Sequence, residues 1–485
     1  MEELSSINNQ TEVPTEFPLD ISDKTKIPLN RALGLGTGIL LVAGIMIGSG
    51  VFKKIVPMSQ SLMSEPGILS AWIVAGIITM LGAFTYTGLA SMTTESGGIY
   101  EYLRLSYGNF FAFLFGWMIF MIGGSGAIAA LAFVFSQAVN TLINIPDLTD
   151  SWKDISIAGF IFPFASSGIK LFAVLVIAIL SWINYRGVKN GGRLNNVVTA
   201  AKILGIIILI IAGFLYPSPA DFEEVEATAG GVSNLGVLFS AFFGALLSAL
   251  WAYDGWANIT YISGEIKNPK KNVPLAIIGG VTIAMTLYVL LNYVYMRVLP
   301  LPILSSLNDN QVAASEVAGV LLGESGIIVI TVLIMICTLG ALNACIIVYP
   351  RVYYRMSQKG SFFKKAAFVH PIFRTPYIAI FISSLWSGLL VITGTFDLLT
   401  NLVIFTGFLF FAVIAFAVIK MTRNGTIKNK VIGYPYVPWI IIIFSAILVI
   451  NTLIIEPKAS LLGILLVLSG VPFYYYFKKN MTSSV

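Results

Sequence analysis

Charge is scarce in this chain. Only 11% of its 485 residues are Asp, Glu, Lys or Arg and 57% are hydrophobic, a balance that would not keep a soluble domain in solution. Histidine occurs once, at His370 beside Pro371 in a polar stretch, and we expect it to be inert. The apolar runs hold no cluster of His, Asp or Cys of the kind that metal or acid–base chemistry requires. The sequence therefore predicts an integral membrane protein and argues against an enzyme, a metal site or a cofactor.

Cysteine is nearly as rare. Cys337 and Cys345 lie in one apolar run, and their spacing corresponds to about 12 Å along a helix, too far for a disulfide bond. The outer loop predicted over residues 141–170 contains no cysteine. We therefore expect neither a structural disulfide nor a disulfide-linked partner chain.

Apolar runs of about 20 residues, by contrast, recur throughout the chain, and each is long enough to cross ~30 Å of hydrocarbon as a helix. Twelve such runs are predicted, so the expected fold is an all-α membrane protein with twelve transmembrane helices. The predicted spans start near Leu33, Ile68, Phe110, Ile169, Val197, Leu235, Leu275, Ile327, Pro376, Leu398, Val437 and Leu461.

The polar segments indicate the orientation. Residues 1–30 are hydrophilic and lack the charged start and short apolar core of a signal peptide, so they are predicted to form a tail. If both chain ends lie on one side, most loop Lys and Arg residues fall on that side, including Lys267, Lys270 and Lys271. The positive-inside rule then places both termini in the cytoplasm of a cell (plasma or inner) membrane. The net charge of +6 accordingly matches an anionic inner leaflet and not nucleic acid.

Two apolar runs are interrupted near their centres. The first contains GIMIGSGVFKK (residues 44–54), although each helical glycine costs roughly 1 kcal/mol against alanine. The sixth contains ALLSALWAYDGWANITYI (residues 245–262). Five spans follow the same order from each interruption, and an odd number per half predicts inverted repeats of the kind that transporters use. The predicted units are a cytoplasmic tail (1–30), a first repeat (31–216), a second repeat (217–422) and two further helices with a short cytoplasmic C-terminus (423–485).

The interruptions predict a binding site. Lipid cannot satisfy the N–H and C=O groups that a broken helix exposes, so a cavity or a ligand must do so. The amides of Gly48, Ser49 and Gly50 would converge at a helix start, which favours a carboxylate. The carbonyls of Met46 and of residues 251–254 could accept from an ammonium. Together these groups predict a site for a zwitterionic α-amino acid, whereas a small-residue packing face at Gly44 and Gly48 is the alternative.

Several stretches resemble one known family, the amino acid-polyamine-organocation superfamily, and within it the L-type amino acid transporter branch. They cover nearly the whole core and occur in the family's order. The stretches are GIMIGSGVF, ESGGIYEYLRLSYG, FLFGW, WINYRGVKNGGRLNNVVTAAK, WAYDGW followed by GEIKNPKKNVPLAI, and LGALNACIIVYPRVYYRMSQKG.

The resemblance implies a leucine-transporter-like fold of five plus five inverted spans with two extra C-terminal helices, and alternating access around a central amino acid site. Trp251 matches an aromatic residue that covers the bound substrate. The expected substrate-binding residues are Met46, Gly48, Ser49, Gly50, Trp251, Tyr253, Asp254 and Gly255.

Two further residues match coupling or gating positions of the family. Lys202 is similar to a lysine that lies against the unwound part of span one and span eight, where sodium-coupled relatives of the fold hold a cation. The resemblance therefore favours sodium independence. Tyr288 is similar to a tyrosine whose hydroxyl serves the same region. Animal members that pair with a heavy chain use a cysteine in the second outer loop, which this sequence lacks, so a stand-alone bacterial-type protein is expected.

The expected function is sodium-independent transport of L-amino acids, with exchange of neutral amino acids preferred. A proton-coupled or cationic amino acid permease, and a non-transporting amino acid sensor on the same fold, remain alternatives. Asp254 has two possible roles. It could cap the second half of span six, or it could face the site and pair with a cationic side chain or carry a proton.

Overall fold

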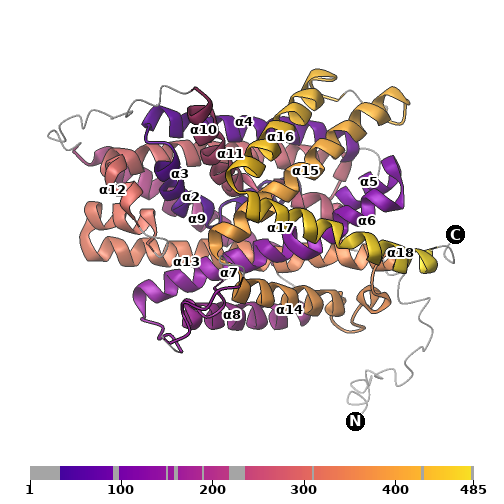
Figure 1. Cartoon of the computed structure of the whole chain (residues 1–485), viewed down its shortest axis with the longest axis horizontal. Helices are drawn as coiled ribbons and strands as arrows, with labels where there is room; N and C mark the ends of the chain where they lie inside the picture. The colour runs from indigo at the N-terminus through magenta and orange to yellow at the C-terminus, as the bar shows by residue number, and fades with distance from the viewer. Residues whose placement is uncertain are drawn as a thin grey trace, which may run out of the picture.

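A computed structural model describes residues 33–90, 98–148, 151–157, 162–187, 191–217, 235–307, 311–427 and 431–481 (Figure 1). The predicted tail (1–30) and the acidic stretch at 221–226 lie outside these residues. All the named elements within these residues are helices, and an isolated β-bridge joins Leu33 to Ile266. The expectation of an all-helical membrane protein is confirmed.

The helices of the first half precede residue 218. They are α1 (Leu35–Met46), α2 (Gly50–Lys53), α3 (Ile55–Ser61), α4 (Glu65–Ala90), α5 (Ile99–Tyr107), α6 (Asn109–Met118), the π-helix η1 (Ile119–Gly123), α7 (Gly124–Leu142), α8 (Ser167–Tyr185) and α9 (Gly191–Leu215).

The second half begins with the helix that carries the second interruption. Its helices are α10 (Leu235–Tyr253), the 3-10 helix η2 (Trp256–Glu265), α11 (Pro269–Val298), α12 (Leu301–Ser306), α13 (Ala313–Gln358), the 3-10 helix η3 (Lys364–Ala367), α14 (Tyr377–Thr393), α15 (Phe396–Arg423), α16 (Tyr436–Ile455), α17 (Pro457–Leu468) and α18 (Gly470–Met481).

Eleven stretches of the described chain are long and apolar enough to cross a membrane. The twelfth predicted span corresponds to α14, an apolar helix of 17 residues. It is short because Pro376 precedes it, where it cannot donate to a helix, and Gly394 ends it. The structure thus gives eleven full-length spans where the sequence predicted twelve.

Both predicted interruptions are present. The first helix ends at Met46 and resumes as α2 at Gly50, and the sixth ends at Tyr253 and resumes as η2 at Trp256. Gly255 has a φ of 94°, a left-handed conformation that glycine adopts without steric cost. The second break therefore falls where glycine allows the chain to leave the helix, whereas the first leaves the helix at Ile47 and resumes at Gly50.

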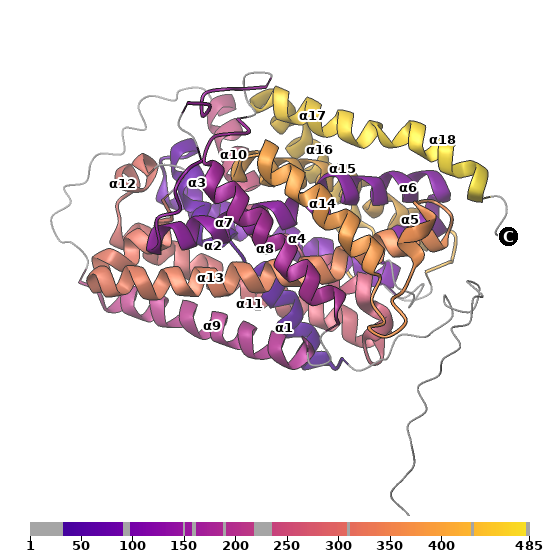
Figure 2. The same ribbon diagram turned by 90° about the horizontal axis from the view of Figure 1, so that it is seen from below.

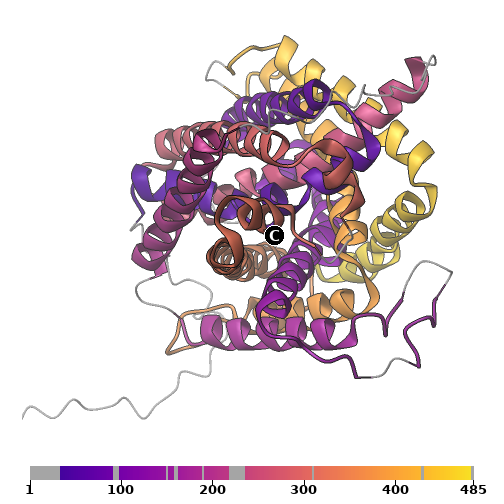
Figure 3. The same cartoon turned by 90° about the vertical axis from the view of Figure 1, so that its left-hand side faces the viewer.

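The broken helices lie inside the bundle. Helix α1 packs on α9 and α11, α10 packs on α3 and α4, and α13 packs along α7. Figures 2 and 3 place α17 and α18 at the periphery, along the outside of the other helices. Main-chain groups at the two breaks are therefore enclosed by protein, which is where a membrane protein can keep irregular backbone.

Candidate functional site

A pocket lies between the two breaks. Besides the breaks themselves, α7 and α13 contribute to its walls. Seven of the eight residues predicted to bind substrate line it: Met46, Gly48, Ser49, Gly50, Trp251, Asp254 and Gly255. The structure therefore brings together residues that are about 200 positions apart in the sequence.

The backbones of the two breaks cross closely. A Cβ on Gly50 would lie 2.6 Å from both Cα and Cβ of Ala252, and a Cβ on Gly255 would lie 2.5 Å from Cγ2 of Ile45. Real Cβ atoms do not approach neighbours this closely, so only glycine fits at either position. Gly50 thus allows the backbone of the first broken helix to contact that of the second broken helix.

The first break supplies hydrogen-bond donors. The amide of Gly48 donates to the carbonyl of Met46 at 2.8 Å and is therefore occupied. Within the described residues, the amides of Ser49 and Gly50 have no hydrogen-bond acceptor. Both residues lie at the start of α2 and line the pocket. Of the three amides predicted to bind a carboxylate, those of Ser49 and Gly50 are therefore available to a ligand.

The acceptors come from the second break. The Met46 carbonyl already accepts two hydrogen bonds, one from the Gly48 amide and one, at 2.7 Å, from the hydroxyl of Tyr288. Both lone pairs of the carbonyl oxygen are therefore used. The Trp251 carbonyl accepts one bond, from the Asp254 amide at 3.1 Å. The Asp254 carbonyl accepts none from the part of the chain that the structure describes. Trp251 and Asp254 thus have more free acceptor capacity than Met46.

Lys202 binds carbonyl groups of the first break on the side away from the pocket. Its side chain is 1% exposed, and its Nζ donates to the carbonyls of Gly44 at 3.0 Å and Ile47 at 3.2 Å. A Cβ on Gly340 of α13 would lie 3.0 Å from the same Nζ. The lysine therefore sits between the end of α1 and α13, at the position that the family resemblance implies, and it does not line the pocket.

Tyr288 joins the two breaks. Its hydroxyl lies 2.7 Å from the Met46 carbonyl and 3.0 Å from the Ala252 carbonyl, and its single proton is shared between them. Tyr253, which was predicted to bind substrate, faces the other way. Its hydroxyl donates to the carbonyl of Trp72 at 3.1 Å, and it does not line the pocket between the breaks.

Sequence reasoning missed several lining residues. The side-chain amide of Asn258 donates to the hydroxyl of Tyr349 at 3.2 Å, and both line the pocket beside Cys345. The sequence held no helical-face signal for Asn258, because the left-handed Gly255 separates it from Asp254 and η2 is a 3-10 helix. No local signal marked Tyr349 or Cys345, which reach the site through the packing of α13.

The family profile described as amino acid permease matches residues 33–473. The chain belongs to the amino acid permease family. This places it in the amino acid-polyamine-organocation superfamily, as the resemblance implied, and makes it a multi-pass membrane transporter of amino acids and not an enzyme.

Individual relatives are similar along most of their length. The permease is 30% identical over 460 residues to the serine/threonine exchanger SteT of Bacillus subtilis (strain 168), covering 94% of this chain and 98% of SteT. It is 28% identical over 452 residues to the b(0,+)-type amino acid transporter 1 of Homo sapiens, covering 93% and 88%. It is 26% identical over 458 residues to the large neutral amino acids transporter small subunit 2 of Mus musculus, covering 93% and 81%.

Trp251, on one side of the permease's pocket, makes side-chain contacts that the sequence did not reveal. The indole Nε1 of Trp251 donates to the Ser49 hydroxyl at 3.3 Å, and its ring lies edge-on to Phe396, with centroids 6.2 Å apart. Beside it, the Lys54 ammonium lies 2.5 Å from the carboxylate of Asp397. The Lys54–Asp397 ion pair thus joins the C-terminal end of α2 to the start of α15, although the two residues are 343 positions apart in the sequence.

Asp254 lies where the permease's pockets meet. It lines the pocket between the breaks and two neighbouring ones. No basic side chain forms an ion pair with it within the described residues, and η2 starts without a side-chain cap hydrogen bond. The backbone of the next residue, Gly255, is hydrogen-bonded to its carboxylate. The capping role and the substrate-pairing role of Asp254 therefore both stay alternatives.

Proposed function

We propose that this permease is a sodium-independent exchanger of neutral L-amino acids that works by alternating access. The observation that carries the proposal is the pocket between the breaks, which has free donors on one side and free acceptors on the other. An α-amino acid presents the complementary pair of groups, a carboxylate and an ammonium. The name of one relative, the serine/threonine exchanger SteT, supports this choice.

In the proposed complex, the substrate carboxylate accepts from the amides of Ser49 and Gly50. The ammonium donates to the carbonyls of Trp251 and Asp254. Hydrogen bonds to charged groups contribute about 1.5–3 kcal/mol each, so these four contacts could fix the orientation of the substrate. The side chain would then extend toward Asn258 and Tyr349, and the Trp251 ring would cover the substrate.

Sodium independence follows from Lys202. Its ammonium occupies the space between α1 and α13, where a bound cation would otherwise contact the carbonyls of the first break. Two unit charges 4 Å apart repel each other by about 4 kcal/mol at an effective dielectric constant of about 20. That repulsion would weaken cation binding there by roughly a thousandfold, since about 1.4 kcal/mol corresponds to a factor of ten.

The proposal includes the predicted architecture. Twelve spans, counting α14, would form inverted repeats over 31–216 and 217–422, followed by two helices in 423–485. Breaks in the first and the sixth span support this arrangement, because they occupy corresponding positions in the two halves. Both termini would be cytoplasmic in the plasma or inner membrane, and no disulfide-linked heavy chain would be needed.

The Asp254 carboxylate, which forms no ion pair within the described residues, favours one alternative, a cationic or proton-coupled permease. In that case the carboxylate would bind the side chain of lysine or arginine, or would carry the coupled proton. A non-transporting sensor on the same fold would use the same pocket but would not move substrate.

The deciding experiment is uptake of radiolabelled amino acids into proteoliposomes. Exchange predicts uptake that depends on internal amino acid and is indifferent to sodium and to a pH gradient. Uptake that requires an inward proton gradient and no internal amino acid would establish the proton-coupled alternative. Binding without uptake would indicate a sensor, and a sodium requirement would contradict the role given to Lys202.

A further inference from the structure

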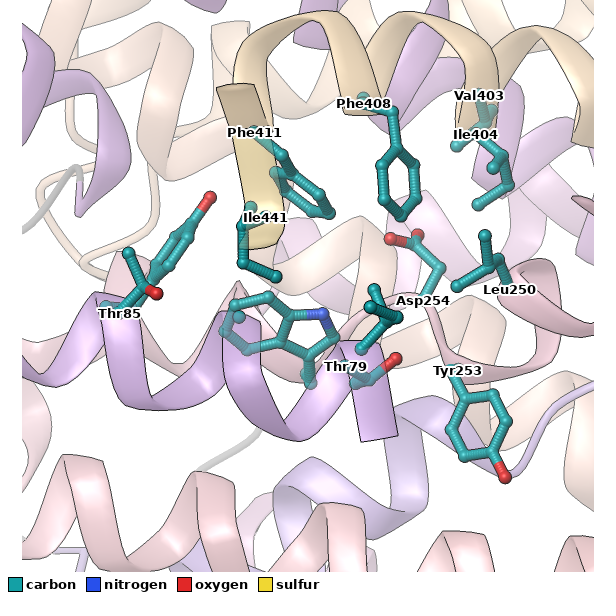
Figure 4. Close-up of a pocket in the computed structure, with 15 residues that line it drawn as sticks. Thr79, Thr85, Leu250, Tyr253, Asp254, Val403, Ile404, Phe408, Phe411 and Ile441 are labelled. Carbon is teal, nitrogen blue, oxygen red and sulfur yellow. The ribbon is translucent and has the colours of Figure 1, made fainter. Parts of the chain in front are cut away.

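Helix α5, the short helix between α4 and α6, borders the space next to the proposed amino acid site. Its first residue, Ile99, lines a pocket that adjoins the site. The two pockets share four lining residues: Asp254, Gly255, Asn258 and Tyr349. Helix α15 borders the same space, since Phe411 lines the adjoining pocket and Figure 4 shows Phe408 and Phe411 directed from α15 toward Asp254. A displacement of α5 would therefore change the space beside the site.

The start of α5 lies directly on the second half of the sixth span. A Cβ on Gly98, the residue before α5, would lie 2.8 Å from the carbonyl carbon of Thr260 in η2. Real Cβ atoms do not approach neighbours this closely, so the two backbones are in direct contact. A displacement of η2 should therefore carry the start of α5 with it.

Two side-chain interactions hold α5 against the end of α13. The carboxylate of Glu101 is buried, and its Oε1 accepts from Nε of Arg355 on α13 at 2.7 Å. The hydroxyl of Tyr100 lies 2.8 Å from that of Ser361, which follows α13. Ser361 donates its single proton to the carbonyl of Met356 at 2.9 Å, so Tyr100 is the donor between the two hydroxyls. Helix α5 is thus attached to α13 by an ion pair and a hydrogen bond.

These interactions continue a series of contacts that begins in the site. The side-chain amide of Asn258 in η2 donates to the hydroxyl of Tyr349 in α13, and the Tyr349 ring lies 6.3 Å from that of Tyr261 in η2. Both tyrosines are buried. Arg355 follows Tyr349 by six residues, which is about 9 Å along a helix. Contacts of η2 and α5 with α13 therefore extend from the site to the C-terminal end of α13, on the face that the sequence predicts to be cytoplasmic.

A second arginine allows the ion pair between α5 and α13 to break reversibly. Nε of Arg104 donates to the other carboxylate oxygen of Glu101, Oε2, at 2.8 Å. Arg104 belongs to α5, so it would stay with Glu101 if α5 moved away from Arg355. Removing every partner from a buried carboxylate is strongly unfavourable, whereas a carboxylate that keeps one guanidinium is still paired. Separation of α5 from α13 therefore requires only the bond to Arg355 to break.

We propose that Glu101 is a positioning residue for transport. Its ion pair with Arg355 holds the amino acid site closed on the predicted cytoplasmic face, and this ion pair breaks whenever the site opens there. Glu101 does not line the pocket between the breaks, so it acts through η2, which starts at the second break and carries Asn258. The inference rests on the alternating access proposed above, and it adds the interaction that controls one of the two openings.

The test measures how fast a water-soluble thiol reagent reaches the site. Cys345 lines the pocket between the breaks, whereas Cys337, the other cysteine of the chain, does not. In a Cys337→Ser background, mass spectrometry follows the reaction of Cys345 with a quaternary-ammonium methanethiosulfonate in lipid nanodiscs. Arg355→Gln should raise the reaction rate about tenfold or more, because the site would be open for a larger fraction of the time. Arg104→Gln removes a guanidinium from the same carboxylate but leaves α5 bound to α13, so it should not raise the rate.

Charge reversal distinguishes a role in opening from a role in folding. The triple variant Glu101→Arg, Arg104→Glu, Arg355→Glu reverses three charges and keeps both opposite-charge pairs, so its reaction rate should return to within about threefold of the original. If the triple variant does not fold, Arg355→Lys keeps the charge and should react more slowly than Arg355→Gln. Reaction of Cys337 in a Cys345→Ser background checks the fold, because this buried thiol should stay slow in every variant.

Three results would overturn the proposal: equal rates in Arg355→Gln and Arg104→Gln, charge-preserving variants that react as fast as Arg355→Gln, or a rise for Cys337 that matches the rise for Cys345. The last result would mean that the variant is loosened as a whole. The thiol reaction is measured without reference to exchange activity. A protein that reacts as expected but does not exchange amino acids would refute only the proposed function, whereas exchange with rates that ignore Arg355 would refute only the role of Glu101.

Discussion

The two broken helices meet at one pocket, but their main-chain groups are satisfied differently. At the first break, fixed protein groups bind the exposed carbonyls: Lys202 binds those of Gly44 and Ile47, and Tyr288 binds that of Met46. At the second break, the Asp254 carbonyl accepts no hydrogen bond from the described residues, and its carboxylate has only the backbone of the adjacent Gly255 as a partner and no basic side chain. The first break is held by the scaffold, and the second is left open.

This difference assigns different parts to the two breaks. A buried polar group without a hydrogen bond costs about 1–3 kcal/mol, so an empty pocket is unfavourable mainly at the second break and at the two free amides of the first. A substrate that satisfies these groups recovers that free energy when it binds. The second break should therefore respond more strongly to the substrate, while the carbonyl side of the first break stays fixed.

The largest effect is expected from Gly50→Leu. The added Cβ would overlap Ala252, where only 2.6 Å is available, and the side chain would cover the two free amides. Losing two charge-assisted contacts of about 1.5–3 kcal/mol each should weaken amino acid binding about a hundredfold or more. Equilibrium binding of a radiolabelled amino acid to monodisperse protein measures this.

Gly36→Leu is the control for that variant, since a Cβ there meets no atom within 4 Å. Decarboxylated amines should also bind poorly to the unmodified protein. Normal affinity in a folded Gly50→Leu protein would show that the substrate carboxylate does not use these amides, and the first break would lose its role as the donor side.

Lys202→Ala should have the next largest effect. The variant leaves the carbonyls of Gly44 and Ile47 without their buried donor, at a cost of about 1.5–3 kcal/mol for each charge-assisted bond. We expect a folded protein whose exchange rate in proteoliposomes falls about a hundredfold. Lys270→Ala, at an exposed position after the second break, is the matched control. Exchange at the original rate would mean that the first break does not depend on the lysine.

Asp254→Asn tests the open break directly and should have a selective effect. If the carboxylate faces the substrate, affinity for lysine or arginine should fall about tenfold to a hundredfold, the equivalent of one charge-assisted contact. Affinity for serine, alanine or leucine should stay the same. Competition assays with one neutral and one cationic amino acid compare the two proteins. Parallel losses, or none, would remove the substrate-pairing role and leave neutral amino acids as the preferred substrates.

Several of these features could be predicted from the sequence, for a physical reason. Glycine and aspartate are costly inside an apolar helix, so their presence at 48–50 and 254–255 marked both interruptions. A charge deep in a span is equally rare, which marked Lys202. These signals are local, because each residue conflicts with its own surroundings.

Other features depended on tertiary packing and left no local signal. Helix α10 continues through Tyr253, so Tyr253 and Trp251, two positions apart, leave different faces, and the Tyr253 hydroxyl donates to Trp72. The sequence did not show that the helix extends that far. The Lys54–Asp397 pair joins distant helices, and either residue alone resembles an ordinary charge at the end of a span. The start of α14 agrees with the span predicted near Pro376, but the helix ends at Thr393, before Gly394, and so is shorter than the roughly 20 residues expected of a span.

The smallest effect should come from Tyr288→Phe, which removes one side-chain link between the two breaks while keeping the ring that packs on Trp72 and Tyr253. The hydroxyl shares one proton between two carbonyls, so the variant loses about one neutral hydrogen bond, worth about 0.5–1.5 kcal/mol. That corresponds to a change of roughly twofold to tenfold in affinity or exchange rate.

The direction of the change in affinity distinguishes two roles of the Tyr288 hydroxyl. If the bond holds the breaks together in the substrate-free protein, freeing Met46 and Ala252 should strengthen binding of the substrate ammonium and slow exchange. If it supports the occupied pocket, binding and exchange should both weaken. Binding and exchange rate measured on the same preparation distinguish these outcomes, and no change in either would show that neither property depends on the Tyr288 hydroxyl.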